Sequence, residues 1–104
     1  MKLKALVLVA TFAIASVAGA MASDGAAIFK SKCAMCHGAD GTGNTQMGKS
    51  MGLKDLGSAD VQKQSDADLT AVVSKGKGKM PAYGGKLSDE DISALVKYVR
   101  TLKK

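Results

Sequence analysis

The chain contains few of the residues from which metal sites and active sites are usually built. Its 104 residues include two cysteines, one histidine, one proline and no tryptophan. Three Cys and His residues are too few for a structural zinc site, which takes about four such ligands. No segment alternates like a strand, which argues against a thioredoxin-like βαβ unit and predicts an all-α fold. Aromatic residues are scarce and no nucleic-acid-binding motif accompanies the lysines, so we expect no nucleic acid as partner.

The N-terminus has the pattern of a secretory signal peptide. Lys2 and Lys4 precede an uncharged stretch, residues 5–23, that is apolar at first and then rich in small residues. A positive start, an apolar middle and A-x-A sites are typical of export followed by cleavage. We predict cleavage after Ala22, with Ala20 as the other site, giving a signal peptide (residues 1–22) and a mature domain (residues 23–104). An uncleaved anchor is the alternative, because the uncharged stretch is only just long enough to span a bilayer.

The predicted mature domain is small and basic. Cleavage after Ala22 leaves 82 residues. They carry 13 basic and nine acidic side chains, which gives a net charge of +4. A domain of this size buries a limited share of its surface and usually needs a staple or a cofactor. Its positive charge favours acidic partners. We expect a periplasmic or otherwise exported protein, because cysteines bonded to other groups persist outside the reducing cytosol. We also expect a monomer with no membrane span after cleavage.

The two cysteines and the histidine stand together in the stretch Cys33-Ala34-Met35-Cys36-His37. This C-x-x-C-H spacing is typical of covalent c-type haem attachment. Residues three and four apart share a face of a helix, so both thiols and the imidazole can point toward one flat ligand. We therefore predict one haem, bound by thioethers to both cysteines, with the histidine under its iron. A disulfide between the cysteines would leave the adjacent histidine unexplained.

Two helices and a loop are predicted around this motif. The first helix is expected over residues 25–36, capped by Ser23 or Asp24. Residues 38–46 form a glycine-rich loop, and one of its carbonyls is expected to accept a hydrogen bond from the free ring nitrogen of the histidine. A further short helix is expected over residues 49–56.

The C-terminal part of the chain carries two clearer helix patterns. Ser65 is predicted to cap a helix that ends at Gly76. Ser88 is predicted to cap the last helix, whose apolar positions have helical spacing: Ile92, Leu95, Val96, Val99 and Leu102. These patterns support the all-α prediction.

The iron needs a second axial ligand, and the chain has no second histidine. Lysine is charged near neutral pH until it loses a proton, whereas methionine is a neutral thioether that raises the reduction potential when bound opposite histidine. The candidates in the mature domain are Met35, Met47, Met51 and Met80. Met80 lies in a glycine-rich loop directly before Pro81, which restricts the backbone of the preceding residue. We therefore predict Met80 as the ligand, with Met51 as the second choice.

Together these motifs resemble those of the class I cytochromes c, and most closely the small bacterial and photosynthetic members. The matching stretches span nearly all of the mature domain: Gly25 and Phe29, the C-x-x-C-H motif, Met80-Pro81-Ala82-Tyr83, and Leu95 with Tyr98. The resemblance implies three to five helices wrapped around one covalently bound haem. It also implies that the first and last helices cross at Gly25, Phe29, Leu95 and Tyr98.

The same resemblance implies a set of site residues. Cys33 and Cys36 correspond to the thioether residues, and His37 and Met80 to the axial ligands of the iron. The chain departs from the family pattern in two ways. No proline follows the histidine closely, so the carbonyl that accepts its ring N–H is not identified. No tryptophan is present, so no contact to the haem propionates is carried over.

The resulting functional prediction is a soluble carrier of single electrons that cycles between ferrous and ferric haem. With both axial positions filled by protein, no open site remains for a substrate, so we do not expect an enzyme. Four lysines near the ligand are expected to dock an acidic surface of redox-partner proteins: Lys75, Lys77, Lys79 and Lys86. The alternatives are a haem-based ligand sensor, in which Met80 is absent from the iron or easily displaced, and a haem subunit of a larger redox complex.

Overall fold

A computed structural model of the chain describes residues 23–104, so the predicted signal peptide (residues 1–22) lies outside the described residues. The helical elements, in chain order, are α2 (Gly25–Ile28), the π-helical turn η1 (Phe29–Cys33), α3 (Ala34–His37), α4 (Gln46–Met51), α5 (Ala59–Gln62), α6 (Asp66–Lys75) and α7 (Asp89–Thr101). Two isolated β-bridges occur, and no strand is formed between residues 23 and 104. The all-α prediction is therefore confirmed.

The first three elements follow one another without a break and form the attachment segment, residues 25–37. Asp24 caps this segment, because its side chain accepts hydrogen bonds from the N–H groups of Ala26 and Ala27. The prediction of one α-helix over residues 25–36 is wrong in the middle. There the N–H of Ala34 bonds to the carbonyl of Phe29, five residues back, which widens the turn. Such π-helical turns occur often at functional sites.

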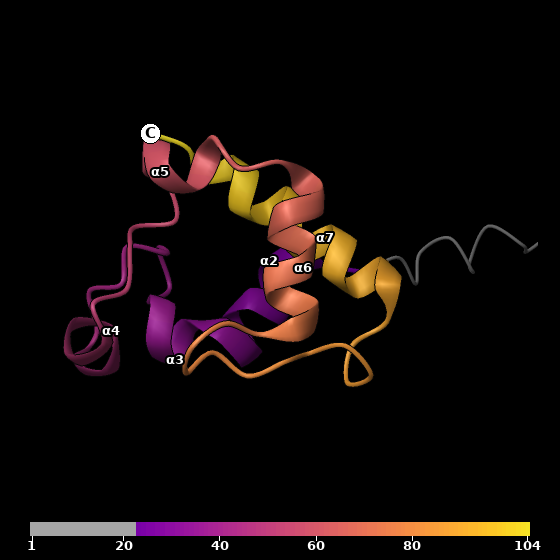
Figure 1. Cartoon of the computed structure of the whole chain (residues 1–104), viewed down its shortest axis with the longest axis horizontal. Helices are drawn as coiled ribbons and strands as arrows, with labels where there is room; N and C mark the ends of the chain where they lie inside the picture. The colour runs from indigo at the N-terminus through magenta and orange to yellow at the C-terminus, as the bar shows by residue number, and fades with distance from the viewer. Residues whose placement is uncertain (1–22) are drawn as a thin grey trace, which may run out of the picture.

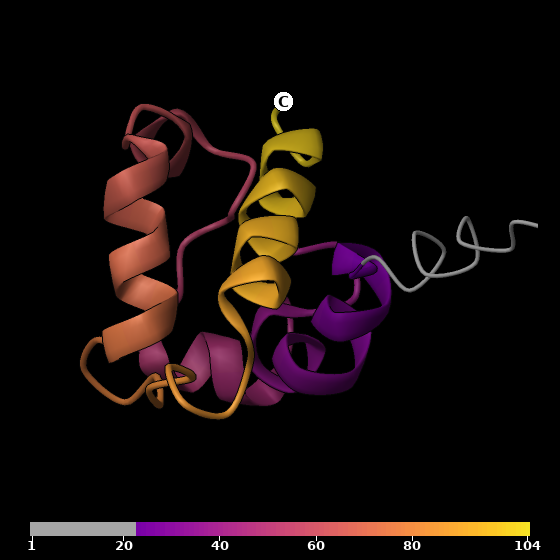
Figure 2. The same cartoon turned by 90° about the vertical axis from the view of Figure 1, so that its right-hand side faces the viewer.

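The attachment segment crosses α7 at close range, as Figures 1 and 2 show. A Cβ at position 25 would overlap the carbonyl oxygen of Ala94, so the crossing requires glycine there. One turn further on, the rings of Phe29 and Tyr98 pack with their centroids 5.1 Å apart. Phe29 is 1 % exposed and Leu95 is 2 % exposed. The predicted helix crossing is thus present.

Helices α6 and α7 pack together and carry the rest of the core. The Ser65 hydroxyl accepts a hydrogen bond from the N–H of Asp68, and the Ser88 hydroxyl accepts one from Asp91, whose carboxylate accepts the Ser88 N–H in return. Both predicted caps are therefore confirmed, as is the end of α6 at Gly76. A buried apolar cluster lies where these elements meet: Val61, Leu69 and Val96, with Leu56 and Val99 packed against it.

The segment between the attachment segment and α6 differs from the prediction. Its first helix, α4, begins after Thr45, whose hydroxyl accepts a hydrogen bond from the N–H of Gly48, and it ends at Gly52. The expected bounds of 49–56 were therefore wrong, because the threonine cap starts the helix earlier and the left-handed backbone of Gly52 ends it earlier. The short helix α5 was not predicted, and Ser58 precedes it without a side-chain capping bond.

Arg100 joins α7 to the chain between α5 and α6. Its guanidinium donates to the carbonyl oxygens of Gln62 (2.9 Å) and Gln64 (2.6 Å) and to the carboxylate of Asp66 (2.9 Å). These bonds fix α7 against the segment that leads into α6. Among residues 23–104, we find no helix with the length and hydropathy that crossing a bilayer would require.

Candidate haem-binding site

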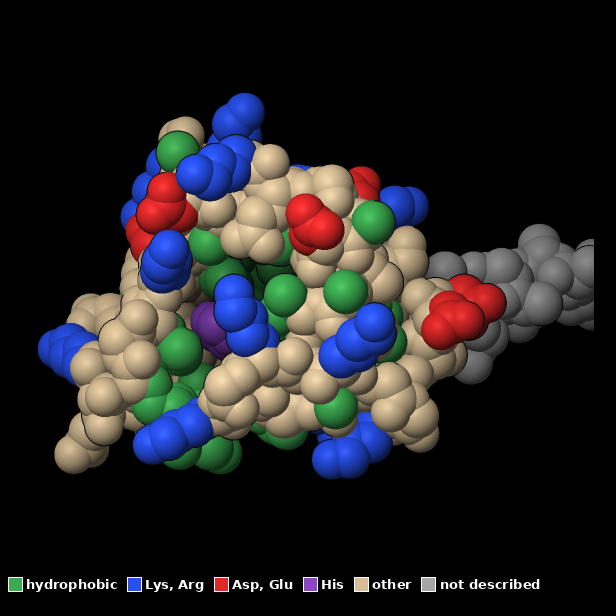
Figure 3. Space-filling model, in the orientation of Figure 1, with side chains coloured by type: hydrophobic (Ala, Val, Ile, Leu, Met, Phe, Trp, Pro, Cys, Tyr) green, Lys and Arg blue, Asp and Glu red, His purple; other side chains and the backbone are tan. Residues whose placement is uncertain are grey.

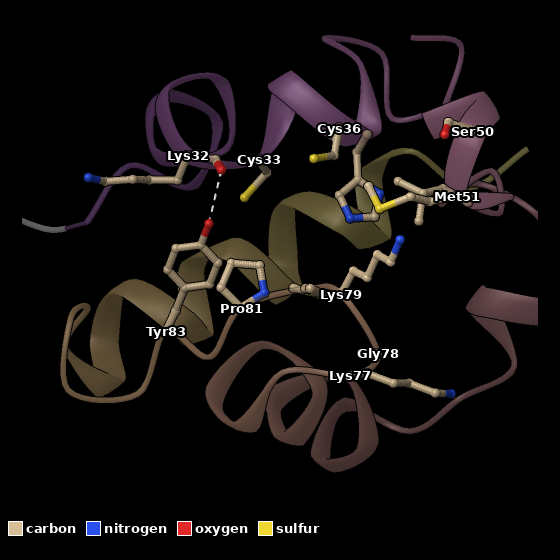
Figure 4. A pocket seen from close by; sticks show the side chains of 13 residues that line it. Lys32, Cys33, Cys36, Ser50, Met51, Lys77, Gly78, Lys79, Pro81 and Tyr83 are labelled. Atoms are coloured by element: carbon tan, nitrogen blue, oxygen red, sulfur yellow. Dashed lines mark hydrogen bonds between the residues drawn. The ribbon is translucent and has the colours of Figure 1, made fainter. Parts of the chain in front are cut away.

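A cavity of about 450 Å³ opens between three parts of the chain. The attachment segment contributes Cys33, Cys36 and His37, and the end of α4 contributes Met51. The third part is the loop between α6 and α7, residues 76–87, called the ligand loop below. Figure 4 shows the two cysteines on one side of the space and Pro81 and Tyr83 of the ligand loop on the other. A volume of this size is in the range of cofactor pockets.

Both cysteines face the cavity as free, half-buried thiols. Cys33 ends the π-helical turn and Cys36 lies in α3. Burial, and secondarily negative charge on Cys36, raises the pKa of Cys33 to about 11. The Cys33 thiol is therefore protonated near neutral pH.

His37 lines the same cavity and has the chemistry of a metal ligand. Burial lowers the pKa of its imidazole, so the ring is neutral near pH 7 and can offer a lone pair to a metal. Its Nδ1 is buried and, within residues 23–104, has no hydrogen-bond partner. The expected bond from this ring to a loop carbonyl is therefore absent. A buried ring nitrogen without a partner is unusual, and together with the donor set it marks a site that fits a metal-centred group.

The loop after His37 bonds to the backbone of the motif and not to the imidazole. The Thr45 hydroxyl donates to the carbonyl of Cys36 (2.7 Å), and the Gly43 N–H donates to the carbonyl of His37 (2.6 Å). Helix α4 then lies so close that a Cβ at position 48 would overlap the Gly43 carbonyl oxygen and lie 2.7 Å from that of Cys36. The loop thereby ends α3 and holds the attachment motif in place.

The structure separates the four candidate methionines into two pairs. Met80 and Met51 both line the cavity. Met35 is 77 % exposed and Met47 is 45 % exposed, and neither lines it. The cavity thus contains the first and the second choice made from sequence. Met47 and Met51 lie four residues apart on α4 and so share a face, which means that helical spacing alone does not separate them and only the structure does.

The lysines around the cavity only partly match those expected from sequence. Lys77 and Lys79 of the ligand loop line the cavity, whereas Lys75 and Lys86 are exposed without lining it. Lys32, which was not singled out from sequence, also lines it. Figure 3 shows basic side chains distributed around hydrophobic ones on a face where the histidine is visible. The cavity therefore has an apolar interior and a positively charged surround.

Tyr83 also lines the cavity, and the sequence prediction used it only as part of a motif. Its hydroxyl donates to the carbonyl oxygen of Lys32 (3.2 Å), which directly precedes the first cysteine. This bond joins the ligand loop to the attachment segment, as the dashed line in Figure 4 shows. Nothing in the spacing of the sequence indicated a contact between residues 51 positions apart.

Comparison with known proteins connects this geometry to a family. A family profile described as cytochrome c oxidase, cbb3-type, subunit III matches residues 20–99. A cytochrome c6 from Microcystis aeruginosa is 42 % identical over 76 residues, which are 73 % of this chain and 90 % of that protein. The cbb3-type cytochrome c oxidase subunit FixP from Azorhizobium caulinodans is 41 % identical over 85 residues, which are 78 % of this chain but only 27 % of that protein.

Solved structures agree with the sequence matches. The KustC0563 c-type cytochrome superposes with a TM-score of 0.72 at 34 % identity, over 78 % of this chain and 99 % of that one. Cytochrome c6C from Synechococcus sp. PCC 7002 gives a TM-score of 0.59 at 38 % identity, over 74 % and 90 % of the two chains. With the motif, the cavity and the all-α fold, these matches show that the chain belongs to the cytochrome c family, as a small class I member that carries covalently bound haem c.

Proposed function

We propose that this electron-transfer haem protein is a soluble carrier of single electrons whose iron is held between His37 and Met80. The observation that carries the proposal is the cavity, which is lined by both cysteines, the histidine and Met80, although Met80 follows the histidine by 43 residues. Neutral imidazole and neutral thioether are the ligand pair that favours a raised reduction potential.

In this proposal the protein supplies position and environment. Bound haem supplies an iron that gains or loses one electron. Cys33 and Cys36 hold the group through thioethers, and buried His37 stays neutral because desolvation lowers its pKa. With Met80 on the other axial position, no coordination site remains open for a substrate, which is why we propose a carrier and not an enzyme.

The main rival ligand is Met51, which also lines the cavity. Met80 is favoured because its backbone N–H and carbonyl both bond to Lys77, at 2.9 and 3.2 Å, and because Pro81 restricts its backbone. Met51 is the last residue of α4, directly before the left-handed Gly52, and no proline adjoins it. A ligand on a restrained loop keeps its geometry when the iron changes charge.

The ligation is tested by the visible spectrum of the oxidised holoprotein. A weak sulfur-to-iron charge-transfer band is expected in the wild type and in Met51→Ala, and it is expected to vanish in Met80→Ala. If the band were lost in Met51→Ala but kept in Met80→Ala, the axial ligand would be Met51. A wild-type spectrum that is high-spin and lacks the band would replace the carrier with the ligand-sensor alternative.

The proposed carrier is a free domain and not a part of a larger complex. The match to a cytochrome c6 covers 90 % of that relative, and the match to FixP covers 27 % of that one. Size-exclusion chromatography of the holoprotein from its native extract is expected to give a monomer. Stable co-elution with a larger haem-containing complex would favour the subunit alternative.

We propose export with cleavage after Ala22. Ser23 belongs to the folded domain, because its hydroxyl donates to the carboxylate of Asp91 at 2.5 Å. Cleavage there keeps this bond and removes the apolar stretch. The intact mass of holoprotein from the periplasmic fraction is expected to be that of a chain that begins at Ser23. A mass that includes residues 1–22 would indicate an uncleaved anchor.

We propose that partner proteins bind, through an acidic surface of their own, to the lysines around the cavity. Lys77 and Lys79 line the opening, and Lys75 and Lys86 are exposed nearby in sequence. Opposite charges steer such encounters, and salt screens them. The rate of electron transfer to the partner is therefore expected to fall as ionic strength rises, and to fall less steeply in Lys77→Gln/Lys79→Gln. A rate that is insensitive to salt would exclude the docking surface.

A further inference from the structure

Tyr83 is anchored in the ligand loop by its own backbone. Its N–H donates to the carbonyl of Val73 in α6 (2.9 Å), and its carbonyl accepts the N–H groups of Lys86 and Leu87 (2.9 Å each). The residue therefore has a fixed place between the end of α6 and the turn that leads to α7. It lies three residues after Met80, with Pro81 between them.

The side chain of Tyr83 extends from this anchor across the edge of the cavity. Its hydroxyl donates to the Lys32 carbonyl in the attachment segment, immediately before Cys33 (Figure 4). Between residues 23 and 104, this is the one hydrogen bond that connects the ligand loop (residues 76–87) to the attachment segment (residues 25–37). The two walls that face the haem are thus joined by a single phenol.

We propose that Tyr83 is a positioning residue whose hydroxyl tethers the ligand loop to the attachment segment and so keeps Met80 on the iron. The inference rests on the proposed His37/Met80 ligation and adds how the weaker ligand is retained. When the Met80–iron bond breaks, the ligand loop must move away from the attachment segment. That motion stretches the bond from the tyrosine hydroxyl to the Lys32 carbonyl. The tether therefore opposes each opening event.

The surroundings of the phenol keep it able to donate. Burial raises the pKa of Tyr83 above its usual value of 10. The hydroxyl is consequently protonated near neutral pH, where the tether is needed. The Lys86 ammonium lies 5.9 Å from the ring centroid, a cation–π contact that adds to the placement of the ring.

The test measures how easily an external ligand replaces Met80. Imidazole is titrated into the oxidised holoprotein, and its apparent dissociation constant is read from the haem spectrum. An external ligand binds only the open form, so its apparent affinity scales with the open population. Loss of one hydrogen bond to a neutral acceptor is expected to increase that population about two- to tenfold. Tyr83→Phe should therefore bind imidazole about two- to tenfold more tightly than the wild type.

The control makes the same chemical change at the other tyrosine of the domain. Tyr98 packs against Phe29 at the crossing of α2 and α7, away from the ligand loop. Tyr98→Phe is expected to leave the imidazole affinity at the wild-type value. Both variants are expected to keep the charge-transfer band in the absence of imidazole and a wild-type thermal midpoint within a few degrees, because the tether acts on opening and not on the core.

Met80→Ala separates failure of the tether from failure of the ligation. If Met80→Ala binds imidazole much more tightly than the wild type while Tyr83→Phe equals the wild type, the tether is overturned and the ligation stands. If Met80→Ala and the wild type bind imidazole equally, the ligation itself is wrong and the tether falls with it. An equal gain in Tyr83→Phe and Tyr98→Phe would also overturn the proposal, since the effect would not come from the ligand loop.

Discussion

The attachment segment and the ligand loop lie on two sides of one cavity, and the chain holds them in different ways. The attachment segment is held by backbone. The carbonyls of Cys36 and His37 accept bonds from the following loop, and its first helix presses against α7 through glycine. The ligand loop is mostly exposed, and a single tyrosine hydroxyl joins it to the attachment segment within the described residues.

This difference separates stability from ligation. Close backbone contacts cannot adapt to an added atom, because protein interiors are packed as densely as organic crystals. Changes on the attachment side, meaning the attachment segment with the following loop and α4 that pack against it, should therefore act on the whole fold. An exposed loop with few partners opens at low cost. Changes in the ligand loop should instead act on how firmly the sixth ligand is held while the fold stays intact.

The largest effect is expected for Gly48→Ala, on the attachment side. The new methyl group would overlap the Gly43 carbonyl oxygen and approach that of Cys36, and both are backbone atoms that cannot rotate away. We expect the free energy of unfolding to fall by about 3 kcal/mol, the upper end for an overpacked site. Guanidinium denaturation of the holoprotein, followed by circular dichroism, measures this loss.

The adjacent exposed residue gives the control for this prediction. Lys49→Ala lies on the same short helix and is expected to change the free energy of unfolding by less than about 0.5 kcal/mol. If Gly48→Ala were as stable as Lys49→Ala, the attachment side would be adaptable, and the contrast between the two walls would fail.

The second effect tests the scaffold behind both walls. Arg100→Met keeps much of the side-chain volume but removes the donors to the carbonyls of Gln62 and Gln64. We expect a loss of about 2 kcal/mol in the free energy of unfolding, because these bonds involve a charged donor and their acceptors are left without it. The charge-transfer band should be unchanged, since α7 and α6 carry no residue of the cavity.

Asp66→Asn separates the backbone bonds of Arg100 from its ion pair. The Asp66 side chain is 76 % exposed, so its pairing with Arg100 is expected to contribute no more than about 0.5 kcal/mol. A loss in Asp66→Asn as large as that in Arg100→Met would mean that the ion pair, and not the two carbonyl bonds, holds this corner.

The features predicted correctly from sequence are those with a short-range physical signal. The serines at positions 65 and 88 predicted their caps because a hydroxyl bonds to an N–H only three residues away. Gly25 and Phe29 predicted the helix crossing through the family resemblance. The attachment motif was recognised because its spacing is rare, and the cavity brings all three of its functional side chains together.

The features that were missed depend on contacts between distant residues or on weak local preferences. The π-helical turn over Phe29–Cys33 has no spacing rule of its own in a single sequence. Helix α5 is four residues long and lacks a side-chain cap bond, so little in its sequence marked it. Helix α4 begins earlier than predicted because Thr45, which the prediction placed in the loop, caps it. The bond from Tyr83 to Lys32 arises only once the two walls meet.

A smaller effect on stability is expected in the ligand loop. Pro81→Ala releases the backbone restraint on Met80 without removing a buried group, since Pro81 is exposed. We expect the free energy of unfolding to change by less than about 1 kcal/mol, mainly through the unfolded chain. Imidazole should nevertheless bind the oxidised haem more tightly than in the wild type. A variant that unfolds as readily as Gly48→Ala would show that the ligand loop belongs to the global fold.

The smallest effect is expected for the ion pair that ties the C-terminus to the loop between α4 and α5. The Lys104 ammonium bonds to the Asp55 carboxylate at 2.6 Å, and this bond, with the N–H of Gly57, lowers the pKa of Asp55 below its usual 3.8. A carboxylate with a lowered native pKa stabilises the fold above its unfolded pKa, and this contribution is lost as the pH falls through the native pKa. Asp55→Asn should therefore lower the thermal midpoint slightly near neutral pH.

The pH dependence of this small difference distinguishes an ion pair from a packing effect. As the pH drops below about 4, the wild type loses the pair by protonation, so its thermal midpoint should approach that of Asp55→Asn. High salt near neutral pH should narrow the same gap, because the Lys104 side chain is 63 % exposed and its charge is accessible to screening ions. A gap that stayed constant in acid and in salt would mean that the ion pair with Lys104 contributes nothing measurable, and that Asp55→Asn acts through packing at the C-terminus.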